Sequence, residues 1–82
     1  MTAGDAFPPI VELDLKGLKC PLPALRTRKA LAGAAAGTRL VVTCTDPMAV
    51  IDIPHVAQET GATLEARTVQ QGLLTFILRK AG

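Results

Sequence analysis

The stretch of this 82-residue sequence best suited to chemistry is a cysteine set beside two prolines. Cys20 is followed directly by Pro21, and Pro23 comes after one further residue. Each proline ring fixes its own φ angle, so we expect the cysteine to lie on a rigid corner of the chain. The thiolate is the reactive form of cysteine, and this corner would therefore present a sulfur anion to other molecules.

A predicted strand precedes this cysteine. Residues 10–15 alternate, with Val11, Leu13 and Leu15 on one face, which is typical of a half-buried strand. Gly17 ends the strand. Cys20 therefore follows the carboxyl end of a strand by only a few residues.

A predicted helix over residues 22–36 follows the cysteine, and Gly37 is expected to end it. The amino end of a helix carries a partial positive charge that favours a thiolate. Pro21 and Pro23 lack N–H groups that could solvate the sulfur, so we expect exposure and rigidity to matter more than a strongly lowered pKa. The apolar face of this helix is predicted to hold Ala24, Leu25, Leu31, Ala32 and Ala35.

A second strand and turn come next. Residues 38–45 are rich in β-formers, with Leu40, Val42 and Cys44 on one face. Asp46 then caps a turn or short helical piece over 47–51. Because an interior proline breaks a helix, Pro54 predicts that the helix proper starts at a second cap, Asp52, and that Gly61 ends it. Its apolar face is predicted to hold Ile53, Val56 and Ala57.

The last third of the chain predicts a hairpin. Residues 63–69 alternate with Leu64 and Ala66 inward, and residues 70–72 form a short connection whose glycine allows positive φ. Residues 73–80 form the last strand, with an inward face that holds Leu74, Phe76 and Leu78.

The order βαβαββ predicts an α+β fold, a two-layer α/β sandwich with a four-stranded mixed sheet and two helices on one face. A short tail over residues 1–9 precedes the domain over 10–82. If the first two strands run parallel, their carboxyl ends share one sheet edge, where ligands bind in such sheets. Asp46 and Asp52 would then lie near Cys20, although helix capping alone explains both aspartates.

Composition narrows the function. The net charge is only +2, and Trp and Tyr are absent, so direct nucleic-acid binding is not indicated. We expect no signal peptide and no membrane span, and hence a cytoplasmic protein with reduced thiols. No second cysteine has the spacing of a redox dithiol, and Cys20, Cys44 and His55 lack zinc-ligand spacing. No metal or cofactor is predicted.

A lone activated cysteine suits the transfer of sulfur. Such a thiol can accept a sulfur atom as a persulfide and pass it to another protein's thiol, a reaction that depends on thiolate character and access. Cys44 continues an apolar strand face and is interpreted as core. Three cations are candidate contacts for a partner protein, on the same end or on the exposed side of the first helix: Lys19, Arg26 and Lys29.

The sequence resembles the TusA family of small sulfur carriers, also called SirA-like. The matching signature runs from Leu15 through Gly17, Cys20, Pro21 and Pro23, and it continues with Asp46-Pro47, Asp52-Ile53-Pro54 and the ending 76–80. The resemblance spans residues 10–82. It implies the sandwich fold and a persulfide on Cys20, with Gly17, Pro21, Pro23, Asp46 and Asp52 in support.

The resemblance also implies partners. The donors would be cysteine desulfurases or rhodaneses, and the acceptors DsrE-type or other proteins, in tRNA thiolation, molybdenum-cofactor supply or sulfur oxidation. Such a chain is a persulfide carrier rather than a stand-alone multiple-turnover enzyme, and it meets nucleic acid only through partners. Two alternatives stay open: a non-catalytic RNA- or protein-binding module that uses the basic face of the first helix, and a redox sensor with a Cys20–Cys44 disulfide.

Overall fold

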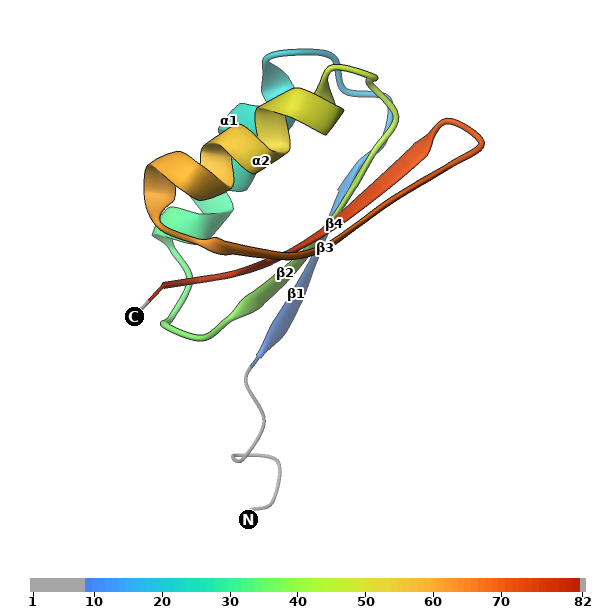
Figure 1. Cartoon of the computed structure of the whole chain (residues 1–82). Coiled ribbons are helices and arrows are strands. Elements are labelled where there is room, and N and C mark those ends of the chain that lie inside the picture. The colour runs from blue at the N-terminus through green and yellow to red at the C-terminus, as the bar shows by residue number, and fades with distance from the viewer. Residues whose placement is uncertain (1–8, 82) are drawn as a thin grey trace.

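Two layers make up the fold, a four-stranded sheet and a pair of helices on one of its faces (Figure 1). The computed structural model describes residues 9–81, so most of the expected tail over 1–9 lies outside the described residues. The predicted α+β class is confirmed. The elements are β1 (Ile10–Leu15), α1 (Leu22–Ala32), β2 (Arg39–Cys44), α2 (Ala49–Thr60), β3 (Thr63–Gln70) and β4 (Leu73–Arg79).

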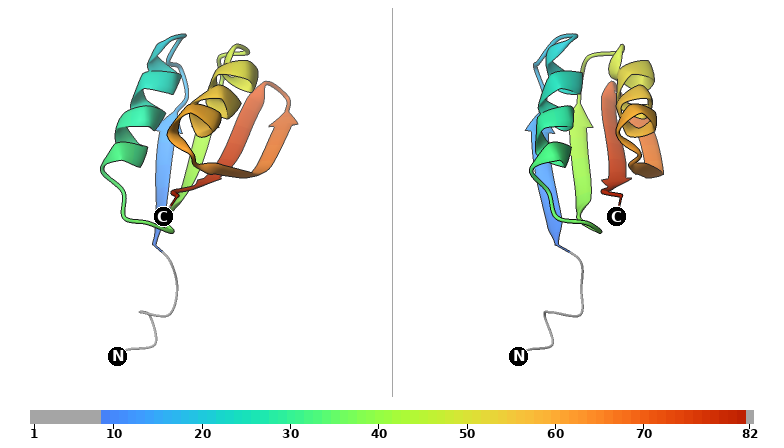
Figure 2. Two further views of the ribbon diagram at one scale, coloured as in Figure 1. Left: turned by 60° about the vertical axis from the view of Figure 1, so that its left-hand side comes forward. Right: turned by 90° about the vertical axis from the view of Figure 1, so that its left-hand side faces the viewer.

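The sheet has the order β1-β2-β4-β3, and β1 runs parallel to β2 (Figure 2). The other two pairings are antiparallel. Leu15, the last residue of β1, pairs with Cys44, the last residue of β2. The loops that follow these two strands therefore start side by side, as the parallel crossover predicted.

The core lies between the sheet and the helices. The predicted inward faces of β2, β4 and α2 are confirmed, because every side chain assigned to them is buried. Burying one of the Val, Leu, Ile or Phe side chains among them contributes roughly 1.5–3 kcal/mol to stability. These residues are Leu40, Val42, Cys44, Leu74, Phe76, Leu78, Ile53, Val56 and Ala57.

Helix α1 is shorter than predicted and turns a different face to the core. It ends at Ala32 rather than near residue 36, because Gly33, a poor helix former, follows at the C-cap. Leu25 is 53% exposed, whereas Thr27 is fully buried. The Thr27 hydroxyl donates to the carbonyl of Pro23 at 2.8 Å, which satisfies its polar group inside the core.

Helix α2 is one continuous helix from Ala49, so the prediction that Asp52 caps it was wrong. Asp52 lies in its first turn, and Pro54 lies inside it. The proline removes only one backbone hydrogen bond, to the carbonyl of Val50 four residues earlier. The N-cap residue is Met48, which has no side-chain cap, and Asp46 accepts the Met48 N–H at 3.1 Å in the turn before the helix. Gly61 ends it with φ +78°, as predicted.

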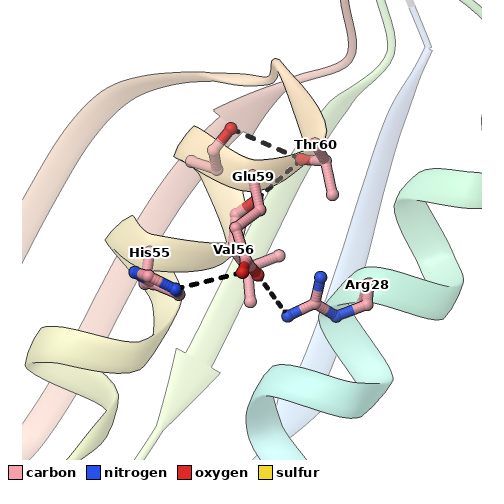
Figure 3. A network of polar contacts seen from close by, with 6 residues as sticks. Arg28, His55, Val56, Glu59 and Thr60 are labelled. Carbon is pink, nitrogen blue, oxygen red and sulfur yellow. Dashed lines mark hydrogen bonds and ion pairs between the residues drawn. The ribbon is translucent and has the colours of Figure 1, made fainter.

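The two helices are joined by a polar network on their outer side (Figure 3). Arg28 of α1 donates to Glu59 of α2 at 2.6 Å, and His55 Nε2 lies 3.1 Å from the second oxygen of the same carboxylate. The Arg28 hydrogen bond is the main reason that the pKa of Glu59 lies below its ordinary value. Of these contacts the Arg28–Glu59 ion pair links α1 to α2, while His55 and Glu59 both belong to α2.

Strand β3 contains a bulge between Leu64 and Ala66. Leu64 pairs with Leu78 on the core side, but Ala66 pairs with Ile77 on the open face of the sheet. The prediction that Ala66 points inward was therefore wrong, since the bulge shifts the alternation by one residue. No helix within residues 9–81 has the length and apolar character needed to cross a bilayer.

Candidate functional site

The loop between β1 and α1 carries Cys20 and is held to the neighbouring strand end. A tight turn starts it, in which Leu18 N–H donates to the Leu15 carbonyl at 3.2 Å. Gly17 has φ +84° in this turn, a conformation that favours glycine. Its N–H donates to the Thr45 hydroxyl, just beyond β2, at 2.9 Å. The sequence-based predictions missed Thr45, whose one signal is its place beside Asp46.

Asp46 ties the Cys20 loop to the start of α2. One carboxylate oxygen accepts the Cys20 N–H, and the other accepts the Met48 N–H. These two amide hydrogen bonds, with a smaller contribution from the charge of Lys19, hold the pKa of Asp46 below its ordinary value. The predicted nearness of Asp46 to Cys20 is therefore observed, and the carboxylate accepts one backbone amide from each of the two crossover loops.

Asp52 contacts the cysteine sulfur itself. The Cys20 thiol donates to Asp52 Oδ2 at 3.2 Å. This hydrogen bond is the largest cause of a raised pKa for Cys20, followed by partial desolvation and by the negative charges of Asp52 and Asp46. The carboxylate of Asp52 therefore opposes the thiolate that the amino end of α1 was expected to favour.

The two prolines bracket the first turn of α1. Pro21 is the N-cap residue, and Pro23 is buried inside the first turn. The Leu22 N–H donates to the Lys19 carbonyl at 2.8 Å, so the chain closes a turn around Cys20 before the helix begins. Cys20 itself is exposed. The predicted accessibility of this corner is thus observed.

An apolar surface lies at the same edge of the sheet, and the sequence-based predictions missed it. Besides Val50, which lines a pocket with Val69 and Leu74, two large side chains in the first turns of α1 and two at the start of α2 are exposed, although apolar residues of amphipathic helices usually face the core. The ends of both helices lie beside the Cys20 loop (Figure 2). We call this set the apolar rim: Leu22, Leu25, Met48 and Ile51.

The three cations predicted to contact a partner are not together. Lys19 lies beside Asp46 in a small pocket of about 230 Å³ under the Cys20 loop. Arg26 and Lys29 instead line an open groove of about 780 Å³ along the flank where α1 meets β1. The structure therefore places only Lys19 next to the cysteine.

Cys44 belongs to the core, as predicted. Its side chain is 0% exposed, and burial raises its pKa to about 11. Cys20 and Cys44 are both free thiols. Within the described part of the chain, histidine, cysteine and acidic side chains form no group of three or more that could hold a metal ion.

Comparisons with known proteins show the family to which the chain belongs. The family model described as sulfurtransferase TusA matches residues 11–80. The sulfur carrier protein TusA of Allochromatium vinosum is 40% identical over 70 residues, which cover 85% of this chain and 92% of that protein. The crystal structure of a SirA-like protein from Desulfitobacterium hafniense superposes with a TM-score of 0.75 at 23% identity, over 88% of this chain and 99% of that one. The chain belongs to the TusA family of sulfur carriers.

Proposed function

We propose that Cys20 carries sulfane sulfur as a persulfide, which it takes from a donor protein and passes to an acceptor protein. The observation that supports this most is the exposed thiol on a loop pinned at Gly17 and at the Cys20 amide. A fixed, accessible thiol can meet the active site of a partner without a pocket of its own. Sulfur exchange between thiols needs no built-in base or metal.

The apolar rim and Lys19 are the surface on which we expect donor and acceptor to dock. Leu25 and Ile51 are 53% and 61% exposed, and a partner that covers them gains hydrophobic contact around the sulfur. Donors of the cysteine desulfurase or rhodanese class and acceptors of the DsrE-like class fit this role. The acceptor pathway would be tRNA thiolation, molybdenum-cofactor supply or sulfur oxidation.

The proposed compartment is the cytoplasm, where thiols such as Cys20 and Cys44 stay reduced. The carrier would meet RNA only through its partners. The family membership favours this role over a non-catalytic module that binds through the basic face of α1. On that face Arg28 is already paired with Glu59.

Mass spectrometry tests the persulfide directly. The protein is incubated with a cysteine desulfurase and cysteine, or with a rhodanese and thiosulfate. We expect a gain of about 32 Da per added sulfur, removed by dithiothreitol. Cys20→Ser should gain nothing, whereas Cys44→Ala should gain as much as the wild type. Equal loading of Cys20→Ser and wild type would refute the proposal.

A further inference from the structure

Two carboxylates meet Cys20 from the crossover that follows β2, and they are not equivalent. Asp46 is engaged by two backbone amides and lies near Lys19. The contact that the structure gives Asp52 is the Cys20 thiol, at 3.2 Å. The charges of Asp52 and Asp46 both act on the Cys20 thiol, and Lys19 is the cation that acts on Asp46. The thiol therefore sits in a local field that is negative.

We propose that Asp52 is a positioning residue that keeps Cys20 as a hydrogen-bonded thiol in the free carrier. Donor and acceptor proteins then release the Cys20 thiol from this hydrogen bond by placing a lysine or arginine against Asp52. This inference rests on the proposed function. Asp52 thus keeps the thiol protonated, and the cation of the partner allows the thiolate to form.

The effect of Asp52 on the Cys20 thiol follows from electrostatics. A thiolate 3.2 Å from a carboxylate loses a hydrogen bond and gains a repulsion, so Cys20 stays protonated in the free protein. The thiol form reacts slowly with oxidants and alkylating agents. A carrier that waits between partners is protected in this way, even though its sulfur is exposed.

The need for a cation follows from docking. A partner that covers the apolar rim also covers Asp52, which lies in the same first turn of α2 as Ile51. A carboxylate buried at an interface is costly unless it is paired. A partner lysine or arginine both pairs with Asp52 and cancels its repulsion of the Cys20 thiolate. Docking and activation are thereby the same event.

The transfer step is balanced without an outside oxidant or reductant. The proton of Cys20 leaves to solvent, and Sγ attacks the outer sulfur of the donor persulfide. The donor's S–S bond breaks, and its electron pair stays on the donor cysteine, which takes a proton from solvent. One thiol and one persulfide become one persulfide and one thiol.

The first test is the pH profile of Cys20 alkylation by iodoacetamide, without any sulfur donor. Asp52→Asn should shift the profile to lower pH and speed alkylation at pH 7 by about threefold or more. At pH values above both midpoints the wild type should react at least as fast, because nucleophilicity falls with pKa. This crossing of the two profiles separates a charge effect from a loosened loop.

Matched variants control this test. Glu12→Gln removes one exposed carboxylate from β1 and should leave the profile unchanged. Asp52→Glu should keep the wild-type profile, and Cys20→Ser reports any reaction of Cys44. If Asp52→Asn does not fold, as judged by circular dichroism, Asp52→Ser replaces it. A profile that does not move, or that moves equally in Glu12→Gln, overturns the proposal.

The second test asks whether a positive charge near Asp52 makes Cys20 more reactive. Cys20 is treated at low salt with cystamine, a doubly positive disulfide, and with the neutral disulfide of 2-mercaptoethanol. The ratio of the two rates should be about threefold higher in wild type than in Asp52→Asn, as one Coulomb interaction in water gives. Equal ratios would contradict the role assigned to cations. Neither test uses sulfane sulfur, so each can fail or succeed independently of the persulfide proposal.

Discussion

The backbone conformation of Gly17 determines the direction of the loop that carries Cys20. Its φ of +84° turns the chain after β1, and its N–H reaches the Thr45 hydroxyl. No atom lies within 4 Å of the position that a Cβ would take there, so space is not the constraint. The backbone conformation alone requires glycine, since other residues adopt positive φ at a cost.

We expect Gly17→Ala to lower the free energy of unfolding by roughly 1–2 kcal/mol through this strain. Gly33→Ala is the matched control, because Gly33 has φ −91° and only ordinary contact with a carbonyl. It should be neutral or stabilising by up to about 1 kcal/mol, since it restricts the unfolded chain. Urea unfolding measures both, and equal effects at the two sites would contradict the role of positive φ.

Sequence reasoning located the residues of the site but not their contacts. The placement of Cys20, Asp46 and Asp52 at one edge follows from a parallel crossover, which the order of elements specifies. The direction of the Cys20 pKa shift depends on where the Asp52 side chain points, and that is set by the start of α2 at Ala49. The sequence did not indicate this start, because Pro54 was expected to break a helix that begins before Asp52.

At the scale of elements, the bulge in β3 joins three strands on the open face. It places Glu65 where its carboxylate accepts from Arg39 of β2 at 2.7 Å and lies 3.5 Å from Arg79 of β4. The Arg39 hydrogen bond is the main reason that the pKa of Glu65 is lowered. No local pattern predicts such a bulge, because its partners lie far away in the sequence.

The ion pairs of Glu65 with Arg39 and Arg79 make the stability of the fold depend on pH. A lowered pKa means that the folded state holds protons less tightly, so the contribution of Glu65 is complete above its ordinary pKa of 4.5 and is lost as the pH falls through the folded value. Glu65→Gln should therefore unfold at lower urea than wild type at pH 7. The two midpoints should converge in acid, unlike those of wild type and Glu12→Gln. A constant gap across pH would count against the ion pairs.

On the scale of the whole molecule, the fold separates its two thiols. Cys44 pairs across the sheet with Leu15 and Leu74 in the core, while Cys20 lies on the exposed edge. Strand alternation was enough to predict this burial. In helix α1 the same kind of reasoning failed, since Leu25 is exposed and Thr27 is buried. Apolar periodicity does not reveal that the Thr27 hydroxyl bonds to a backbone carbonyl or that Leu25 is left exposed.

This separation predicts the outcome of mild oxidation. Native protein should not lose two hydrogens within one chain, because Cys44 is buried and its pKa is about 11. The product should be a disulfide between two molecules through Cys20, and Cys44→Ala should give it at the same rate. Intact mass without reduction distinguishes the cases. An internal disulfide in the folded monomer would revive the redox-sensor interpretation.

The shared anchor at Asp46 has a kinetic consequence. Because one carboxylate accepts both the Cys20 and the Met48 N–H, the backbone that carries the sulfur is tied to the start of α2 before any partner arrives. Under the proposed function, donor and acceptor must approach Cys20 from the same side and exclude each other. Each delivery then requires the carrier to leave one protein before it joins the next. A complex that dissociates slowly would limit the rate of sulfur delivery, so we expect short-lived complexes with both donor and acceptor.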